Sequence, residues 1–156
     1  MYLLFATGFA ALILIGDLLI KEYVETHFEI GEERAALDGK VLFRRVHNRG
    51  LALNALEGKP KLVKTLSAAA MCFCTGMAAA VMTQKGHWIR KSGYVCLLAG
   101  AASNLYDRFV REYVVDYIGL KTKWKKVTRI TFNLGDVCIF AGTLTVLLTF
   151  LKSERK

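Results

Sequence analysis

Residues 134–151 read LGDVCIFAGTLTVLLTFL, a run in which the only charge is Asp136, close to its start. An apolar helix needs about 20 residues, and about 17 at the least, to cross the hydrocarbon core of a bilayer. Three further segments of this kind stand at 1–20, 62–83 and 93–110. We therefore predict a mainly α membrane protein with four transmembrane helices, forming a single domain over residues 1–156.

The composition of the whole chain agrees with this class. Of 156 residues, 54% are hydrophobic and 22% are charged, and there is a single proline, which excludes low-complexity, collagen-like and disordered chains. The net charge is +9. In a soluble chain this charge indicates a nucleic-acid partner, but here the basic residues lie between apolar segments. Anionic membrane lipids are the predicted partner, and nucleic acid is not.

The polar segments between the apolar runs predict the rest of the architecture. Segment 1–20 lacks a basic start and a small-residue cleavage site, so we expect a retained helix and no signal peptide. In the following segment, about 22–61, we expect a short amphipathic helix around Glu32–Leu37. One or two strands are expected within Lys40–Leu53. Lys121–Arg129 forms a basic loop that carries Trp124, an aromatic residue suited to the membrane interface.

The distribution of basic residues bears on the orientation in the membrane. With four spans, both termini share one side. Thirteen lysines and arginines lie in the loops 34–64 and 121–129 of the opposite side, against six in 85–91 and 152–156. Taken alone, the positive-inside rule places the termini outside the cytoplasm.

Several polar residues fall inside or at the ends of the apolar segments, where a charge is costly. Asp17 and Lys21 stand four residues apart, on one helix face. A second group lies on one face near the end of segment 93–110 and in the residue just beyond it: Asn104, Asp107, Arg108 and Arg111. Two interpretations remain open for both groups, an internally paired structural cluster and a part of a functional site.

Two aspartates are the strongest candidates for chemistry. Asp116 follows segment 93–110, and Asp136 lies in the first turn of segment 134–151. Asn133 and Asp136 also fit a helix-capping pair, which is the structural alternative. Because antiparallel neighbouring spans return to the same membrane face, we expect the two carboxylates to meet. Two carboxylates in one site share a proton, so that one activates water while the other hydrogen-bonds a substrate carbonyl.

Rival chemistries find no residue pattern in the sequence. The three histidines, His27, His47 and His87, are scattered in polar segments, and neither HExxH nor GxSxG occurs. The cysteines lie inside apolar runs without a CxxC pair: Cys72, Cys74, Cys96 and Cys138. We predict no metal site, no disulfide scaffold and no cofactor.

Four blocks hold most of the candidate polar residues. The blocks are Asp17-Leu-Leu-Ile-Lys21, Asn48-Arg-Gly50-Leu-Ala52, Gly100-Ala-Ala-Ser-Asn104-Leu-Tyr-Asp107-Arg108 running on to Val114-Val115-Asp116, and Phe132-Asn133-Leu-Gly-Asp136. In their order and spacing they resemble the bacterial lipoprotein signal peptidase family, also called signal peptidase II.

The resemblance implies an aspartic endopeptidase of the bacterial cytoplasmic membrane. It implies removal of the signal peptide from prolipoproteins, just before a diacylglyceryl-modified cysteine and near the extracytoplasmic face. The catalytic pair maps onto Asp116 and Asp136. The supporting positions map onto Asp17, Lys21, Asn48, Gly50, Asn104, Asp107, Arg108 and Asn133. The resemblance also implies a β-cradle and flap in segment 22–61, a tight turn at Gly50 and cytoplasmic termini, against the count of basic residues. We further expect a monomer.

The sequence departs from the family pattern at five positions, namely Leu18, Leu51, Leu53, Ser103 and Glu112. These departures leave an alternative open, in which the chain is a catalytically silent paralogue that binds lipoprotein precursors or has a structural role in the membrane. A small-solute or ion carrier is disfavoured, because the charges gather toward one membrane face.

Overall fold

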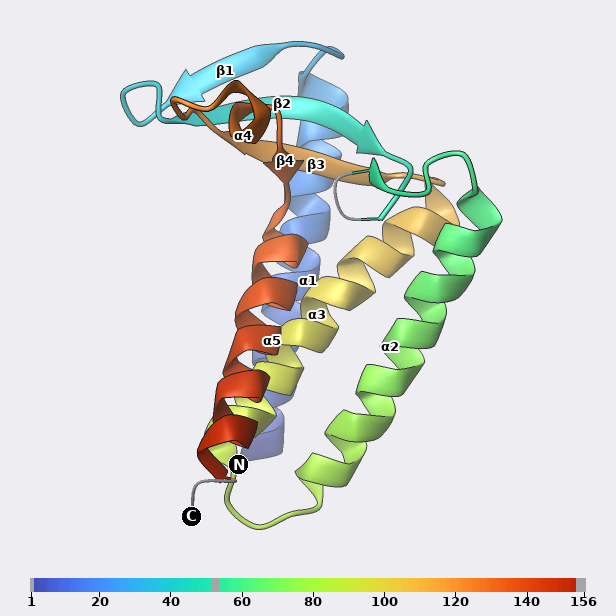
Figure 1. Ribbon diagram of the computed structural model, residues 1–156, viewed down its shortest axis with the longest axis vertical. Helices are drawn as coiled ribbons and strands as arrows, with labels where there is room; N and C mark the ends of the chain where they lie inside the picture. Colours follow the sequence, from blue (N-terminus) through green and yellow to red (C-terminus); the bar gives the residue numbers. More distant parts are fainter. Residues whose placement is uncertain (1, 52–53, 154–156) are drawn as a thin grey trace.

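The computed structural model describes residues 2–51 and 54–153, so the departure at Leu53 lies outside the described residues, as does Ala52. Long helices run side by side, and a small sheet lies across one end of them, away from both termini (Figure 1). The long helices are α1 (Tyr2–His27), α2 (Pro60–Met82), α3 (Trp88–Val110) and α5 (Leu134–Ser153).

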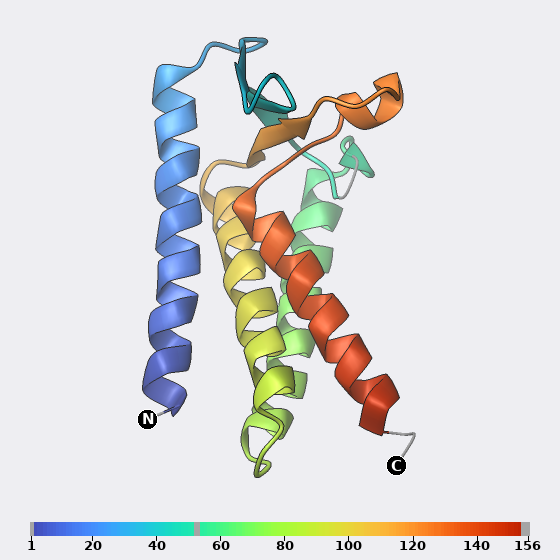
Figure 2. The ribbon, with the colours of Figure 1, turned by 90° about the vertical axis from the view of Figure 1, so that its left-hand side faces the viewer.

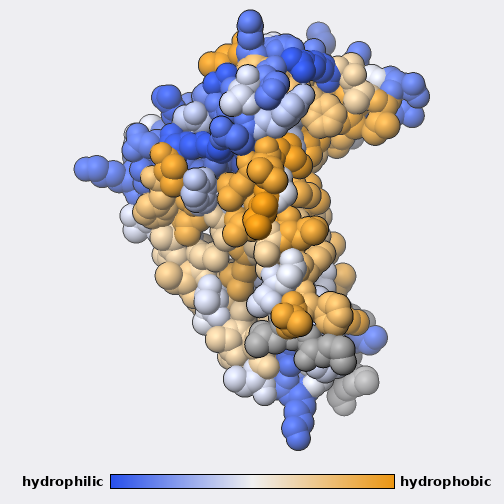
Figure 3. Space-filling view, turned by 180° about the vertical axis from the view of Figure 1, so that it is seen from behind, coloured by the Kyte–Doolittle hydropathy of each residue, from blue (hydrophilic) through white to orange (hydrophobic). Residues whose placement is uncertain are grey.

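Three of these helices are long and apolar enough to cross a membrane within the part of the chain that the structure describes. They cover residues 4–27, 60–82 and 134–152. Hydrophobic side chains gather over the helices, and hydrophilic ones over the end that carries the sheet (Figure 3). The first apolar helix is longer than the sequence predicts, since α1 continues past Ile20 to His27. Its last turns pack against the sheet through Val24, and Phe28, just beyond the helix, packs there as well.

The predicted span 93–110 is a helix, α3, but its composition does not match the other three. It carries Arg90, Lys91, Asp107 and Arg108. α3 lies at the centre of the bundle and packs against each of the other long helices. Its polar side chains therefore find partners inside the protein, which explains why a helix of the bundle is less apolar than its neighbours.

Glycines let α3 and α5 approach each other closely. A Cβ atom on Gly100 of α3 would lie 2.3 Å from the carbonyl oxygen of Gly135 on α5. A Cβ atom on Gly142 would lie 2.5 Å from the carbonyl oxygen of Gly93. Small residues at such crossings allow backbone contact between membrane helices. This contact fixes the start of α5, and with it Asp136, against α3.

The sheet is antiparallel and its order follows the chain, β1-β2-β3-β4. Seen from the side, it lies above the ends of the helices, opposite the two termini (Figure 2). Its strands are β1 (Glu33–Ala36), β2 (Val41–Asn48), β3 (Val114–Leu120) and β4 (Thr131–Phe132). A short helix, α4 (Lys125–Thr128), lies in the basic loop between β3 and β4. The strand expected at residues 41–43 is confirmed as the start of β2.

The amphipathic helix predicted around Glu32–Leu37 is wrong, because residues 33–36 form β1. Ala35 pairs with Leu42 and Ala36 with Val41 across the hairpin. Leu37, Asp38 and Gly39 all have left-handed backbones, with φ of 51°, 56° and 75°. That conformation stops a right-handed helix and reverses the chain into β2.

The side chains of β3 alternate between two faces of the sheet, one packed against the core and one lining a cavity. Val115 and Tyr117 are almost fully buried and pack with Val24 of α1 and with Phe28, the residue after that helix. Because successive side chains of a strand point to opposite faces, Val114 and Asp116 face the other way. Both of these residues line a large cavity.

Candidate active site

A cavity of about 770 Å³ opens beside α3 and reaches the underside of the sheet. Side chains of α2, α3 and α5 make most of its walls, including Leu66, Ala70 and Met71 of α2 and Ile139 and Phe140 of α5. Apart from the hydroxyl groups of Ser67 and Thr143, its polar lining comes from the sheet and the nearby helix ends: Asn48, Asn104, Arg108, Asp116, Thr131 and Asp136. The cavity is thus largely apolar, with carboxylates and amides gathered where the helices meet the sheet.

Asp116 is placed by the pairing of β2 with β3. Val46 lies opposite Asp116 in the register, and Asn48 stands two residues farther along β2, on the same face. The side-chain amide of Asn48 donates to Asp116 Oδ2 at 3.0 Å. Asn133 donates to the other oxygen, Oδ1, at 2.8 Å. The carboxyl group is 3% exposed and is oriented through both oxygens.

Asp136 is placed by the start of α5. Asn133 Oδ1 accepts a hydrogen bond from the Asp136 N–H at 2.8 Å, and the Asn133 N–H donates to Asp136 Oδ2 at 3.1 Å. This reciprocal pair confirms the capping arrangement predicted from the sequence, with Asp in the place of the usual Glu or Gln. Asn104 of α3 donates to the remaining oxygen, Asp136 Oδ1, at 2.7 Å.

Asn133 therefore touches both aspartates. Its side-chain amide holds Asp116, and its backbone N–H holds Asp136. The capping role and the site role, which the sequence left as alternatives, belong to the same side chain. Asp116 and Asp136 line the same cavity, and both bind Asn133, so the structure brings the two residues into one site.

Lys21 is the centre of a buried polar cluster behind Asp136. Its ammonium group is fully buried and lies 2.9 Å from Asp17 Oδ2 and 3.1 Å from Asp107 Oδ2. It also donates to Ser103 Oγ and to Asn104 Oδ1, both at 2.9 Å. Because Lys21 occupies the oxygen of the Asn104 amide, the nitrogen of that amide is directed to Asp136.

Asp107 joins this cluster to the sheet. Its Oδ2 accepts from the N–H of Val115 on β3 at 3.1 Å, and its Oδ1 accepts from Arg111 at 2.8 Å. The ion pair expected between Asp107 and Arg111 is therefore present. Asp107 and Lys21 together link α1 and α3 to β3, the strand that carries Asp116.

Arg108 does not pair with a carboxylate of its own cluster, contrary to the structural interpretation. Its guanidinium donates to the carbonyl oxygens of Asn104, at 3.2 Å, and of Gly50, at 3.0 Å. It thus ties the loop after β2 to α3 and lines the cavity. Gly50 also donates its N–H to Asn48 Oδ1 at 3.0 Å, which directs the Asn48 amide toward Asp116. A Cβ atom on Gly50 would lie 2.4 Å from the Asn54 carbonyl carbon, so only glycine fits this turn.

Sequence reasoning missed the roles of two buried residues. Tyr117 donates its hydroxyl to Asp17 Oδ1 at 2.8 Å and accepts from the Leu134 N–H at 3.1 Å. Ser103 donates to Asp17 Oδ2 at 2.5 Å while it accepts from Lys21. Recognising residues 114–120 as a strand would have placed Tyr117 on the face opposite Asp116, but that strand was not predicted from the sequence. Ser103 had been noted as a departure from the family pattern, and in the structure it belongs to the Lys21 cluster.

The electrostatics of the site favour the protonated form of Asp116. Burial raises the pKa of Asp116 to about 7, and the negative charge of Asp136 acts in the same direction. The amides of Asn48 and Asn133 oppose this shift. The pKa of Asp116 thus lies near neutral pH. Within residues 2–51 and 54–153, no group of three or more His, Cys, Asp or Glu side chains is arranged to hold a metal ion.

Comparisons with known proteins agree with this architecture. The family model described as signal peptidase (SPase) II matches residues 9–152. A lipoprotein signal peptidase of Fusobacterium nucleatum is 28% identical over 93% of this chain and 85% of that protein. One from Nostoc sp. is 31% identical over 87% of this chain and 82% of its own length.

Two solved structures, both described as bacterial membrane enzymes determined by the in meso method, have a similar fold. The one at 2.3 Å resolution has a TM-score of 0.81 and 20% identity, and covers 96% of this chain and 88% of that one. The one at 1.9 Å resolution has a TM-score of 0.78 and 21% identity, and covers 94% of this chain and 92% of that one.

Proposed function

This chain belongs to the signal peptidase II family, and we propose that it removes the signal peptide from diacylglyceryl-modified prolipoproteins with Asp116 and Asp136 as the catalytic pair. Membership makes the chain a peptidase of lipoprotein processing. The aspartic mechanism, the lipidated substrate and the roles of the named residues are the proposal. The single observation that carries it is the pair of carboxyl groups in one cavity, both held by Asn133.

The two aspartates have different surroundings, which suits them to different roles. Asp136 lies in the first turn of α5, where the helix dipole favours a negative charge. We assign to it the ionised state and the role of general base toward water. Asp116, buried on β3 with its raised pKa, carries the shared proton and donates it toward the scissile carbonyl.

The reaction then balances with water as the only co-reactant. Asp136 accepts a proton from water as the water oxygen bonds to the carbonyl carbon, and Asp116 gives its proton to the carbonyl oxygen. When the resulting diol collapses, the C–N bond breaks and the proton on Asp136 passes to the leaving nitrogen. The proton of the remaining diol hydroxyl returns to Asp116. The products are a signal peptide with a new carboxyl end and a lipoprotein with a free amino end.

The apolar part of the cavity supports a lipidated substrate. Leu66, Ala70 and Met71 of α2 face the cavity together with Ile139 and Phe140 of α5. An acyl chain that enters this space from the bilayer would exchange contacts with lipid tails for contacts with apolar side chains, and it would meet few polar groups there. The lipid would thereby hold the peptide bond beside the carboxyl groups.

We further propose that all four long helices cross the bacterial cytoplasmic membrane as one domain, with cytoplasmic termini and the sheet outside. The polar groups of α3 are satisfied by its neighbours, which supports α3 as the fourth span. The basic residues of the outer loops oppose this orientation. However, residues 33–48 and 114–120 are folded into a sheet, and folded segments are less subject to the positive-inside rule. A monomer is the assembly that we expect.

The test is cleavage of a purified precursor by the purified protein in detergent. We expect cleavage of the diacylglyceryl-modified precursor and little cleavage of the same precursor without the lipid. Binding of the lipidated precursor without release of the signal peptide would instead identify a catalytically silent paralogue. Equal cleavage of both precursors would contradict the proposed role of the apolar cavity.

A further inference from the structure

The loop between β3 and β4, residues 121–130, displays a cluster of cations that the site does not use. The cluster consists of Lys121, Lys123, Lys125, Lys126 and Arg129. All five are exposed, and none takes part in an ion pair among the described residues. No acidic residue occurs between Asp116 and Asp136. The loop is therefore a strongly positive surface without internal compensation.

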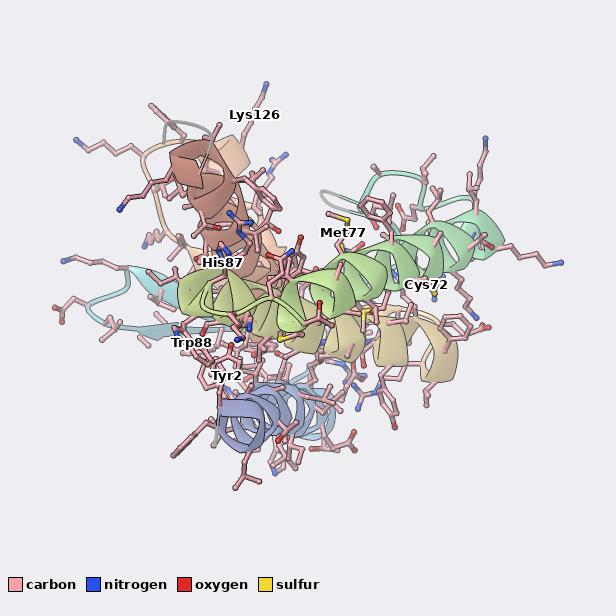
Figure 4. The ribbon with its side chains drawn as sticks, turned by 90° about the horizontal axis from the view of Figure 1, so that it is seen from below. Tyr2, Cys72, Met77, His87, Trp88 and Lys126 are labelled. Atoms are coloured by element: carbon pink, nitrogen blue, oxygen red, sulfur yellow. The ribbon has the colours of Figure 1, made fainter. Side chains whose placement is uncertain are left out.

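Hydrogen bonds within the loop give it a defined shape. The hydroxyl of Thr128 donates to the carbonyl oxygen of Thr122 at 3.1 Å and accepts from the Thr122 N–H at 3.0 Å. Arg44 of β2 donates to the Thr128 carbonyl oxygen at 2.7 Å, which anchors the loop to the sheet. The cations are thus presented from a fixed scaffold. Lys126 points outward from the molecule (Figure 4).

Apolar groups accompany these cations. Trp124 is 76% exposed, and Leu120 and Ile130 at the ends of the loop are also exposed. Trp is enriched at the level of lipid headgroups because its ring is apolar at one end and polar at the other. Four residues beyond Ile130, α5 begins, and its exposed Phe140 lies on the apolar surface of a membrane helix. The loop therefore stands next to the point where α5 enters the membrane.

We propose that this loop binds the headgroups of anionic phospholipids, with Trp124 inserted among them. We place the loop at the outer leaflet, and this placement rests on the proposed function. The binding of anionic headgroups rests on the loop itself. Charge complementarity selects the occupant, since the phosphates of anionic lipids supply the negative charge that the loop lacks. Near such a surface each lysine contributes roughly a five-fold preference at low salt. The loop continues into β4, whose Thr131 lines the catalytic cavity, so bound lipid would lie at its rim.

Trp124 is itself the reporter for the test. The chain has two tryptophans, so Trp88→Phe leaves Trp124 alone. The full-length protein is reconstituted in two sets of phosphatidylcholine vesicles with roughly a third phosphatidylglycerol. In one set the phosphatidylglycerol carries bromine at a shallow acyl position, and in the other an equal amount of phosphatidylcholine does. We expect brominated phosphatidylglycerol to quench Trp124 at least about two-fold more strongly, and high salt to remove the difference.

Charge variants separate a local site from general attraction. In Lys123→Gln/Lys125→Gln/Lys126→Gln the quenching ratio should fall to about one. The matched control, Lys59→Gln/Lys61→Gln/Lys85→Gln, loses the same charge elsewhere and should keep the ratio. Equal quenching in the parent protein, or an equal loss in the control, would overturn the proposal. So would loss of the preference on adding inorganic phosphate at constant ionic strength, which would assign the loop to a free anion. Because no substrate is present, a failure here is distinct from a failure of the peptidase proposal.

Discussion

Replacing Lys21 by methionine should destabilise the protein strongly, because it strands buried negative charge. In the buried part of the cluster two cations, Lys21 and Arg111, balance Asp17 and Asp107, while the exposed Glu22 also pairs with Arg111. Lys21, Asp17 and Asp107 have no exposed surface. Methionine preserves most of the volume and leaves a net negative charge out of contact with water. Removal of one partner from a buried ion pair costs about 3–5 kcal/mol, and we expect a loss in that range.

A second substitution tests whether charge is the cause. In Asp17→Asn/Lys21→Met the cluster is neutral again, because one carboxylate and one ammonium group have been removed together. The asparagine can still accept a hydrogen bond from Tyr117, which now bonds Asp17 at 2.8 Å. We expect the double variant to recover at least about half of the loss, which is about 1.5–2.5 kcal/mol.

The measurement is the free energy of unfolding in mixed micelles, followed by circular dichroism as a denaturing detergent is titrated. The control is Lys59→Met, because Lys59 is exposed and forms no ion pair among the described residues. It should change the free energy by no more than about 0.5 kcal/mol. A loss below about 1 kcal/mol for Lys21→Met, or a double variant less stable than Lys21→Met alone, would refute the account of the cluster.

Three further predictions concern the dyad and the backbone around it. Because the pKa of Asp116 is raised to about 7, folding favours its protonated form. The free energy of unfolding should therefore fall as the pH rises from about 4 to about 7, by up to about 1.4 kcal/mol per pH unit relative to Asp116→Asn. Parallel pH curves for the two proteins would contradict this. Gly100→Ala should destabilise the protein by about 1–3 kcal/mol, since the new Cβ atom would meet α5. Gly76→Ala should instead stabilise it by about 0.5–1 kcal/mol, because nothing lies within 4 Å of a Cβ atom there. Equal effects of the two changes in thermal unfolding would rule out the close helix crossing. Glu112 has a left-handed backbone with φ of 68°. Glu112→Gly should therefore stabilise the protein by about 1 kcal/mol, although the exposed ion pair with Lys64 is lost. A lower melting temperature of this variant would count against backbone strain at Glu112.

Local patterns in the sequence predicted the helices, the cap and the residues of the site. The apolar runs at 62–83 and 134–151 correspond closely to α2 and α5. The spacing of Asn133 and Asp136 predicted the cap because both of its hydrogen bonds span three residues. The polar face of segment 93–110 supplied Asn104, and the resemblance to a family supplied Asn48; no local pattern reveals the contacts of either amide with the aspartates.

What the sequence did not predict depends on contacts between distant segments. β3 pairs with β2 across a large separation, for example His47 with Val115, so its place in a sheet cannot be deduced from residues 114–120 alone. The amphipathic helix failed because hairpin pairing outweighed a weak helical pattern at residues 32–37. The partners of Lys21 on α3 likewise follow from the packing of α1 against α3.

The most direct test of the account is a double-mutant cycle on the two aspartates, measured as cleavage of a diacylglyceryl-modified precursor. Asp116→Asn and Asp136→Asn each preserve the shape of the side chain, and circular dichroism verifies that both variants are folded. If the two groups share one proton in one reaction, each single change should lower kcat by at least about 1,000-fold, and the double variant should lose little more. Activity within about ten-fold of the parent in either folded variant, or losses that multiply in the double variant, would contradict the dyad.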